Sequence, residues 1–127
     1  MAILKEIMTG DVFTIARDAS VADAASSMLK GRFGSAIVME GSWLTGIFTE
    51  RDVLRAAAAG VDLTSSPVSE WMTSDPVTAS PDMEADEAAE IMMSNGFRHL
   101  PVVEGNSIAG IVSLRDILRT RIRRPAQ

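Results

Sequence analysis

The sequence predicts an α/β protein built from two consecutive copies of a βαββα unit. The first observation is an internal repeat, because residues 8–55 and 72–119 align without a gap and are identical at 18 of 48 positions. The second is that extended and helical patterns follow one another in the same order in both copies. A long-period repeat of this kind constrains the architecture before any single residue is interpreted.

The length of 127 residues suits two small repeats that fold together. A unit of about 64 residues buries only a marginal core alone. We therefore expect repeats at 1–62 and 63–127 to form one compact module. Their sheets are expected to pack face to face, with the helices outside.

Each unit opens with a short extended segment, 12–15 in the first copy and 76–79 in the second. A helix follows, in which apolar residues recur three and four positions apart. Ser20 is the expected N-cap of the first of these helices. The equivalent helix of the second copy is expected to start from Asp82 or Met83.

A β-hairpin comes next in each copy, after a helix stop at Gly31 or Gly96. Apolar runs around a Glu-Gly turn predict strands at 36–39, 44–49, 100–103 and 108–113. Second helices are expected at 50–59 and 114–121, and 61–69 is interpreted as the linker between repeats. We attribute Trp43 and Trp71 to packing.

Composition excludes several functional classes. The net charge of −5 argues against nucleic acid or an anionic membrane as the main partner. No apolar run approaches the ~20 residues of a membrane span, and the N-terminus lacks the features of a signal peptide. The chain has no cysteine, which removes disulfides, thiolate metal sites and thiol nucleophiles. We expect a cytoplasmic protein.

The strongest chemical signal is a Gly-Ile-x-Thr/Ser-x-Arg-Asp segment that occurs at 46–52 and again at 110–116. It places a hydroxyl, a guanidinium and a carboxylate at the start of a helix, where free backbone N–H groups favour an anion. The carboxylate can accept two hydrogen bonds from a ribose diol. These residues are Thr49, Arg51 and Asp52 in the first copy, and Ser113, Arg115 and Asp116 in the second. They predict a nucleotide site.

The same spacing also fits a capping box, in which the hydroxyl residue and the carboxylate exchange hydrogen bonds with each other's backbone. Such a box would occur without any ligand. The occurrence of two copies, each preceded by Gly-Ile, makes this explanation less sufficient, but both interpretations remain open at this point.

The whole chain resembles a stand-alone tandem pair of cystathionine β-synthase (CBS) domains, also called a Bateman module. The resemblance rests on the two Gly-Ile segments and on Ile7-Met8-Thr9, Trp71-Met72-Thr73-Ser74 and Phe97-Arg98-His99-Leu100-Pro101-Val102-Val103. It implies pseudo-twofold symmetry, a cleft between the repeats with up to two adenosyl ligands, and frequent homodimers. The ligands of the family include AMP, ADP, ATP, NAD(H) and S-adenosylmethionine.

Carrying the family pattern over implies two composite sites. The Asp116 site would comprise Thr14, Ile15, Phe33, Gly34, Ser35, Arg98, His99, Ser113, Arg115 and Asp116. The Asp52 site would comprise Thr49, Arg51, Asp52, Thr78, Ala79, Phe97, Arg98 and His99. In both, the aspartate would hold ribose and the hydroxyl would approach phosphate.

The two sites are not expected to be equal. Gly34 and Ser35 stand where the second copy has Arg98 and His99, the basic side chains that would reach phosphates. We therefore predict that the Asp116 site binds a phosphorylated nucleotide better. His99 is the only histidine, so a metal or catalytic role has no partners of suitable spacing.

The predicted function is a regulatory module that binds an adenosyl nucleotide and changes shape or partner affinity. The nucleotide would act as a regulatory ligand and not as a cofactor. No nucleophile with an adjacent base and no phosphate-binding glycine loop is present, so we do not expect an enzyme. A homodimer formed through the helices, with small residues at 56–59, and an unknown effector protein are further expectations. The alternative is a constitutive dimerisation module with vestigial sites.

Overall fold

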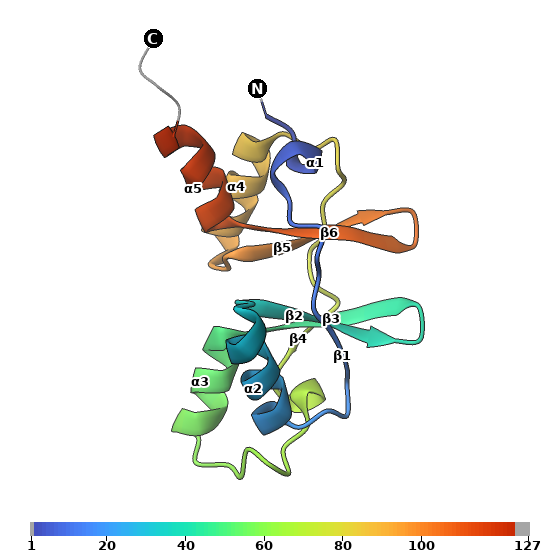
Figure 1. Cartoon of the computed structure of the whole chain (residues 1–127), viewed down its shortest axis with the longest axis vertical. Helices are drawn as coiled ribbons and strands as arrows, with labels where there is room; N and C mark the ends of the chain where they lie inside the picture. Colours follow the sequence, from blue (N-terminus) through green and yellow to red (C-terminus); the bar gives the residue numbers. More distant parts are fainter. Residues whose placement is uncertain (1, 124–127) are drawn as a thin grey trace. The chain divides into compact units, whose positions relative to one another are not determined.

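The computed structural model describes residues 2–123 and confirms the α/β class (Figure 1). The chain divides into two compact units, one formed by residues 12–76 and the other by residues up to 11 together with those from 77 onward. Each unit has its own cluster of buried apolar side chains. The units therefore differ from the sequence repeats at the start of each repeat.

The unit of residues 12–76 is a four-stranded sheet covered by helices. The strand order is β1-β2-β3-β4; β1 is parallel to β2, and the other two pairs are antiparallel. Its elements are β1 (Thr14–Ala16), α2 (Val21–Gly31), β2 (Ser35–Glu40), β3 (Trp43–Thr49), α3 (Glu50–Ala58), the 3-10 helix η1 (Val68–Glu70) and β4 (Thr73–Ser74).

The other unit repeats this plan around the hairpin of β5 and β6. Its elements are α1 (Leu4–Ile7), α4 (Ala85–Asn95), β5 (His99–Glu104), β6 (Ser107–Ser113) and α5 (Leu114–Arg123). A parallel bridge from Ala79 to Val102 and an antiparallel bridge from Thr9 to Ile111 take the places of β1 and β4. Both hairpins thus carry a neighbouring segment on each side.

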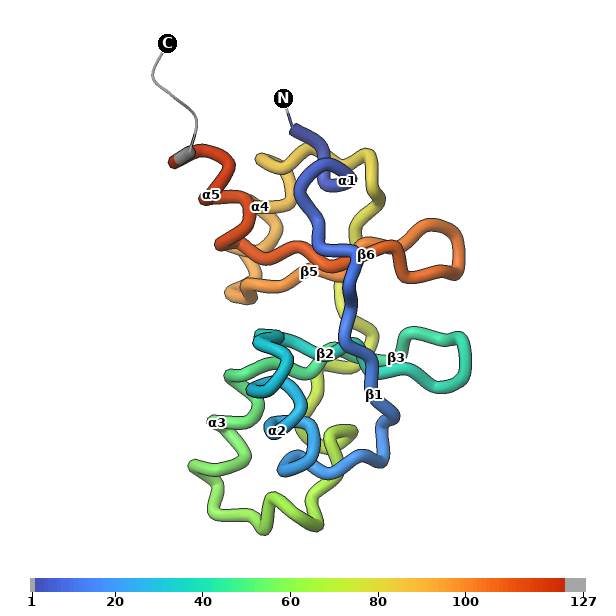
Figure 2. The backbone as a smooth tube through the Cα atoms, viewed as in Figure 1, coloured from blue at the N-terminus to red at the C-terminus, as the bar shows by residue number. Residues whose placement is uncertain are grey.

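The two repeats exchange their N-terminal segments. Thr9 belongs to the first repeat but pairs with β6 of the second, and Thr73 belongs to the second repeat but pairs with β3 of the first. The path of both segments can be followed in Figure 2. Leu4 and Val68, which are 64 residues apart, are each fully buried in the core that receives them. Each core is therefore completed by the other repeat.

The glycine of each Gly-Ile segment is explained by this exchange. A Cβ atom at Gly110 would lie 2.7 Å from the carbonyl oxygen of Thr9 and 2.9 Å from the sulfur of Met8. Gly46 meets Met72 and Thr73 in the same way. Only a residue without a side chain lets the exchanged segment approach so closely.

The predicted helices and hairpin strands are confirmed, with small shifts at their ends. Ser20 caps α2 by accepting a hydrogen bond of 3.0 Å from the Asp23 N–H. The N-cap of α4 is Glu84, so the expected start at Asp82 or Met83 was wrong. Gly96 ends α4 with φ 75°, a left-handed conformation that glycine adopts without strain.

Three further expectations need correction. The strand expected at 12–15 lies at 14–16, and in the second copy only Ala79 forms a bridge. The 61–69 segment is more than a linker, because its carbonyl groups at 63 and 66 accept hydrogen bonds from the first turn of α2. Trp43 is 67% exposed at the end of its hairpin, so it does not pack in a core.

Of the small residues at 56–59, Ala56 is fully buried in the core of its own unit, whereas residues 57–59 are exposed. A homodimer through this helix stays a prediction. No helix within residues 2–123 is long and apolar enough to cross a membrane.

Candidate functional site

The first candidate site lies where β6 passes into α5. The Ser113 N–H donates to Asp116 Oδ2 at 3.0 Å, and the Asp116 N–H donates to Ser113 Oγ at 3.0 Å. This is a complete capping box, so Ser113 and Asp116 define the start of the helix. Within residues 2–123, no group donates to the other carboxylate oxygen, Asp116 Oδ1. One oxygen of this half-buried side chain is therefore available to a ligand.

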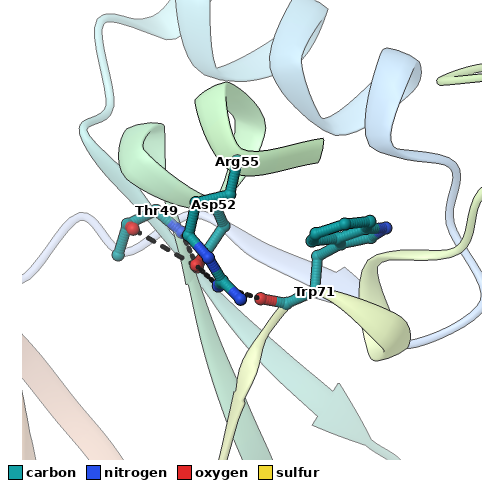
Figure 3. A network of polar contacts seen from close by, with 4 residues as sticks. All are labelled: Thr49, Asp52, Arg55 and Trp71. Carbon is teal, nitrogen blue, oxygen red and sulfur yellow. Dashed lines mark hydrogen bonds and ion pairs between the residues drawn. The ribbon is translucent and has the colours of Figure 1, made fainter. Parts of the chain in front are cut away.

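The equivalent site at the start of α3 is more crowded. The Thr49 N–H donates to Asp52 Oδ2 at 2.9 Å, and the Thr49 hydroxyl lies 3.3 Å from the same oxygen. Arg55 donates to the other oxygen, Oδ1, at 3.0 Å. The Arg55 guanidinium also lies 5.6 Å above the centre of the Trp71 ring, a cation–π distance. Figure 3 shows these four residues together.

Both interpretations of the repeated motif therefore have support. In both copies the aspartate accepts a hydrogen bond from the N–H of the N-cap residue, which supports the structural interpretation. Among the described residues, no donor reaches one of the two oxygens of Asp116, whereas both oxygens of Asp52 accept hydrogen bonds from their own unit. Asp52 is also almost fully buried, with 6% of its surface exposed. The two aspartates are thus not equivalent acceptors.

Basic side chains flank the start of α5. His99 is the cross-strand partner of Ser113, and the Leu114 N–H donates to the Arg98 carbonyl at 2.9 Å. The turn that carries Arg98 and His99 is thereby held against the capping box. Arg98 and Arg115 are exposed, and His99 is half-buried. The α5 start therefore combines a carboxylate, a hydroxyl and two exposed guanidinium groups.

The other unit builds the same frame without these basic groups. Ser35 is the cross-strand partner of Thr49, and the Glu50 N–H donates to the Gly34 carbonyl at 3.2 Å. Gly34 and Ser35 hold the positions of Arg98 and His99. Arg51 is exposed and supplies a cation beside this helix start. The electrostatic difference between the two sites is thus built into the turns.

The expected site residues divide into two sets, one in each unit. In residues 12–76 these are Thr14, Ile15, Phe33, Gly34, Ser35, Thr49, Arg51 and Asp52. In the other unit they are Thr78, Ala79, Phe97, Arg98, His99, Ser113, Arg115 and Asp116. Each composite site draws on both sets, so the pairing of sets across the repeats stays a prediction.

Strand pairing and ring stacking position several residues of these sets within their own units. β1 aligns Ile15 with Val38, and the bridge from Ala79 to Val102 occupies the equivalent position. The Phe33 ring stacks on Phe13 with centroids 5.4 Å apart. This stacking fixes the turn before Gly34 from within its own unit.

Sequence reasoning missed Arg55 as a partner of Asp52. Arg55 has an equivalent at Arg119, so its presence in the repeat was visible. Its aromatic neighbour Trp71 has Ile7 as the equivalent residue, and this difference between the copies was the available signal. Asp52 and Arg55 lie three positions apart on α3, a spacing at which helix side chains meet, so this ion pair follows a local pattern. The contact of Arg55 with Trp71 spans 16 residues and follows none.

Comparisons with known proteins identify the family of the chain. The family model described as "CBS domain" matches residues 4–59 and 68–123. The CBS domain-containing protein YhcV of Bacillus subtilis is 36% identical over 118 residues, which cover 92% of this chain and 84% of YhcV.

Two solved structures are similar in fold. The CBS-domain containing protein ATU1752 of Agrobacterium tumefaciens has a TM-score of 0.88 at 32% identity and covers 94% of this chain and 99% of its own. The CBS domain pair of protein MJ0100, in complex with 5′-methylthioadenosine and S-adenosyl-L-methionine, has a TM-score of 0.87 at 27% identity, covering 95% and 96%. With two matches to the family model, one per repeat, this chain belongs to the CBS domain family as a tandem pair.

Proposed function

We propose that this CBS pair is a regulatory module that binds an adenosyl nucleotide between its two repeats. The observation that carries the proposal is the start of α5. There, a half-buried Asp116 keeps one carboxylate oxygen beside the hydroxyl of Ser113 and the basic residue Arg98.

The chemistry of these groups fits the two ends of a nucleotide. A carboxylate accepts hydrogen bonds from both hydroxyls of a ribose, and a charged acceptor strengthens each of them. The Ser113 hydroxyl and the guanidinium groups of Arg98 and Arg115 favour phosphate, as does the positive end of the α5 dipole. The adenine would lie against the set at Thr14, Ile15 and 33–35 of the other repeat.

The ligand class follows from what such a site recognises. AMP, ATP, NAD and S-adenosylmethionine all carry adenosine and differ beyond its 5′ carbon. The complex of the related CBS pair with 5′-methylthioadenosine and S-adenosyl-L-methionine supports an adenosyl ligand. The basic side chains at Arg98 and Arg115 favour a phosphorylated one here.

Regulation requires that the ligand bind one conformation of the pair better than another. Because a composite site takes groups from both repeats, its ligand would favour the arrangement in which those groups converge. The output would be a changed affinity for an effector protein. This role needs no catalytic group.

A homodimer is the second part of the proposal. A groove between α4 and α5 is lined by Ala89, Met93, Leu114 and Leu118, among others. Met93 is 70% exposed and Ile122 is 80% exposed on these helices. Adjoining exposed apolar side chains favour a protein interface. Sedimentation analysis should show a dimer for the wild type and a monomer for Met93→Glu; a monomeric wild type would contradict this part.

A constitutive dimerisation module remains the second candidate, favoured by one observation. The capping boxes give the repeated hydroxyl and carboxylate residues a structural role without any ligand. In that case the helical faces alone would carry the function.

A thermal-shift panel separates the two candidates. The wild type is heated with AMP, ATP, NAD, S-adenosylmethionine or 5′-methylthioadenosine at millimolar concentration. A ligand that binds only the folded state raises the melting temperature. The regulatory proposal expects a rise with at least one of them, and a smaller rise for Asp116→Asn. No rise with any of the five would favour the constitutive module.

A further inference from the structure

We propose that Arg55 is a specificity-determining residue that competes with ribose for Asp52 and so makes the Asp52 site the weaker of the two. The inference rests on the proposed function and adds the reason for the inequality. It concerns an intramolecular ion pair, which neither the capping motif nor the basic turns of the other unit involve.

The Arg55 guanidinium is held in place from two sides. It donates to Asp52 Oδ1 at 3.0 Å and to the carbonyl oxygen of Trp71 at 3.4 Å. Its carbon lies 5.6 Å from the centre of the Trp71 ring. In Figure 3 the guanidinium lies between the carboxylate and the indole-bearing segment. Asp52 is therefore paired with a cation on the oxygen that the capping interactions leave over.

Asp52 and Asp116 differ in the number of acceptor positions that remain for a ribose diol. A carboxylate has about four lone-pair positions for hydrogen bonds. Asp52 uses three of them, for the Thr49 N–H, the Thr49 hydroxyl and Arg55. With donors from residues 2–123, Asp116 uses one, for the Ser113 N–H. A ribose diol needs two, so it fits Asp116 directly but fits Asp52 only after Arg55 moves away.

The second repeat has the arginine but not the arrangement that holds it. Arg119 is equivalent to Arg55 and exposed, and within residues 2–123 it forms no ion pair with Asp116. Ile7 stands in place of Trp71 and offers no π face for a guanidinium. The competition is therefore confined to Asp52.

The same contact couples Asp52 to the segment of the second repeat that pairs with β3. Trp71 lies between η1 and β4, and its indole packs against the core of the unit. Among the described residues, its buried Nε1 has no hydrogen-bond partner. The indole is thus held by packing and by Arg55 alone. A ligand that takes Asp52 would release the guanidinium from the Trp71 ring.

Calorimetric titration with adenosine tests the competition, with 2′-deoxyadenosine as the matched ligand. Adenosine has the ribose diol but no phosphate. Replacing an arginine therefore cannot change its affinity through a lost phosphate contact. Arg55→Gln removes the ion pair, and Arg119→Gln is the control at the equivalent exposed position. We expect Arg55→Gln to gain affinity at the weaker site by about 10-fold or more, the size of an effect expected for hydrogen bonds to a charged group.

The gain should be absent with 2′-deoxyadenosine and absent in Arg119→Gln. If both proteins bind adenosine and their titrations superimpose, Arg55 does not compete with ribose for Asp52, and the proposed function stands. If neither protein binds adenosine or any ligand of the panel, the proposed function itself is wrong.

Fluorescence of Trp71 tests the contact without any ligand. Trp43→Phe removes the exposed tryptophan and leaves Trp71 as the only emitter. In this background we expect Arg55→Gln to change the emission of Trp71, and Arg119→Gln to leave it unchanged. Emission that is identical with and without Arg55 would overturn the proposed coupling.

Discussion

Ser113 and Asp116 exchange two hydrogen bonds of 3.0 Å at the start of α5, yet leave one carboxylate oxygen of Asp116 without a donor from residues 2–123. The pair can therefore cap the helix and bind a ligand at the same time. Stability and binding can be separated, because the cap needs only an acceptor oxygen whereas the ribose contact gains from the charge.

Replacing Asp116 by Asn should weaken binding far more than folding. The amide oxygen can still accept from the Ser113 N–H, but hydrogen bonds to a charged group, worth about 1.5–3 kcal/mol, are lost. We expect a loss of affinity of roughly 10- to 100-fold for the ligand found in the panel, measured by calorimetry. Asp116→Ala should also lose about 1 kcal/mol of unfolding free energy with the cap.

Glu90→Gln, which alters an exposed carboxylate on α4, is the control for this change in charge. Unchanged affinity in Asp116→Asn would show that the assignment of the ribose contact is wrong.

Truncating Leu4 should destabilise the protein as a core mutation does, although it is the fourth residue. Leu4 is fully buried in a cluster otherwise drawn from the second repeat. Leu4→Ala should lower the unfolding free energy by about 2–5 kcal/mol in urea denaturation. Lys5→Ala, the exposed neighbour on α1, should change it by less than about 0.5 kcal/mol. Equal stability of the two variants would argue against docking of the N-terminal segment.

Adding one methyl group at Gly110 should be costly. Its Cβ would lie 2.7 Å from the Thr9 carbonyl oxygen, so the exchanged segment must shift. We expect Gly110→Ala to lose about 1–3 kcal/mol, the range of an overpacked site. Gly10→Ala is the control, because a Cβ at Gly10 meets no atom within 4 Å. Thermal denaturation of the two variants side by side would reveal the difference.

The pKa of Asp62 should be low because of one neighbour. The Thr64 hydroxyl donates to Asp62 Oδ1 at 2.7 Å and the Thr64 N–H at 3.0 Å, and these hydrogen bonds lower the pKa of Asp62 below its ordinary 3.8. A carboxyl group whose pKa is lowered in the folded state stabilises the protein at pH values above its ordinary pKa. This stabilisation is lost as the pH falls through the lowered pKa. Carboxyl NMR titration should show the pKa of Asp62 rising toward 3.8 in Thr64→Val.

Ser65→Ala is the control for this titration, because the Ser65 hydroxyl makes the smallest of the contributions to the shift. A pKa of Asp62 that is the same in the wild type and in Thr64→Val would contradict the assigned cause.

Local patterns in the sequence predicted the hairpins and the four long helices, because periodicity and turn residues are properties of neighbouring positions. The exchange of segments could not be predicted in this way. Met8-Thr9 and Met72-Thr73 are identical, so nothing local decides which hairpin each joins. The pairing of Thr9 with β6 and of Thr73 with β3, together with the burial of Leu4 and Val68 in their receiving cores, reveals it.

The candidate site followed the same division. Asp116 and Ser113 were predicted because their spacing is that of one helix start. The ion pair of Asp52 and Arg55 has the i,i+3 spacing of neighbours on a helix, so it could have been predicted from the sequence. The contact of Arg55 with Trp71 could not, because Trp71 is distant in sequence. The contact with Trp71 depends on tertiary structure, which an alignment of the two repeats does not describe.

The division of the chain also has a consequence for the order of events during synthesis. Residues 12–76 form one uninterrupted unit, which can fold as soon as they have left the ribosome. The other unit combines residues up to 11 with those from 77 onward, so its earlier segment must wait until β6 has been made. During that interval Leu4 has no core to enter, and the N-terminal segment is exposed to chaperones and proteases. Closing this long loop is slow compared with local folding, so it should be the last step.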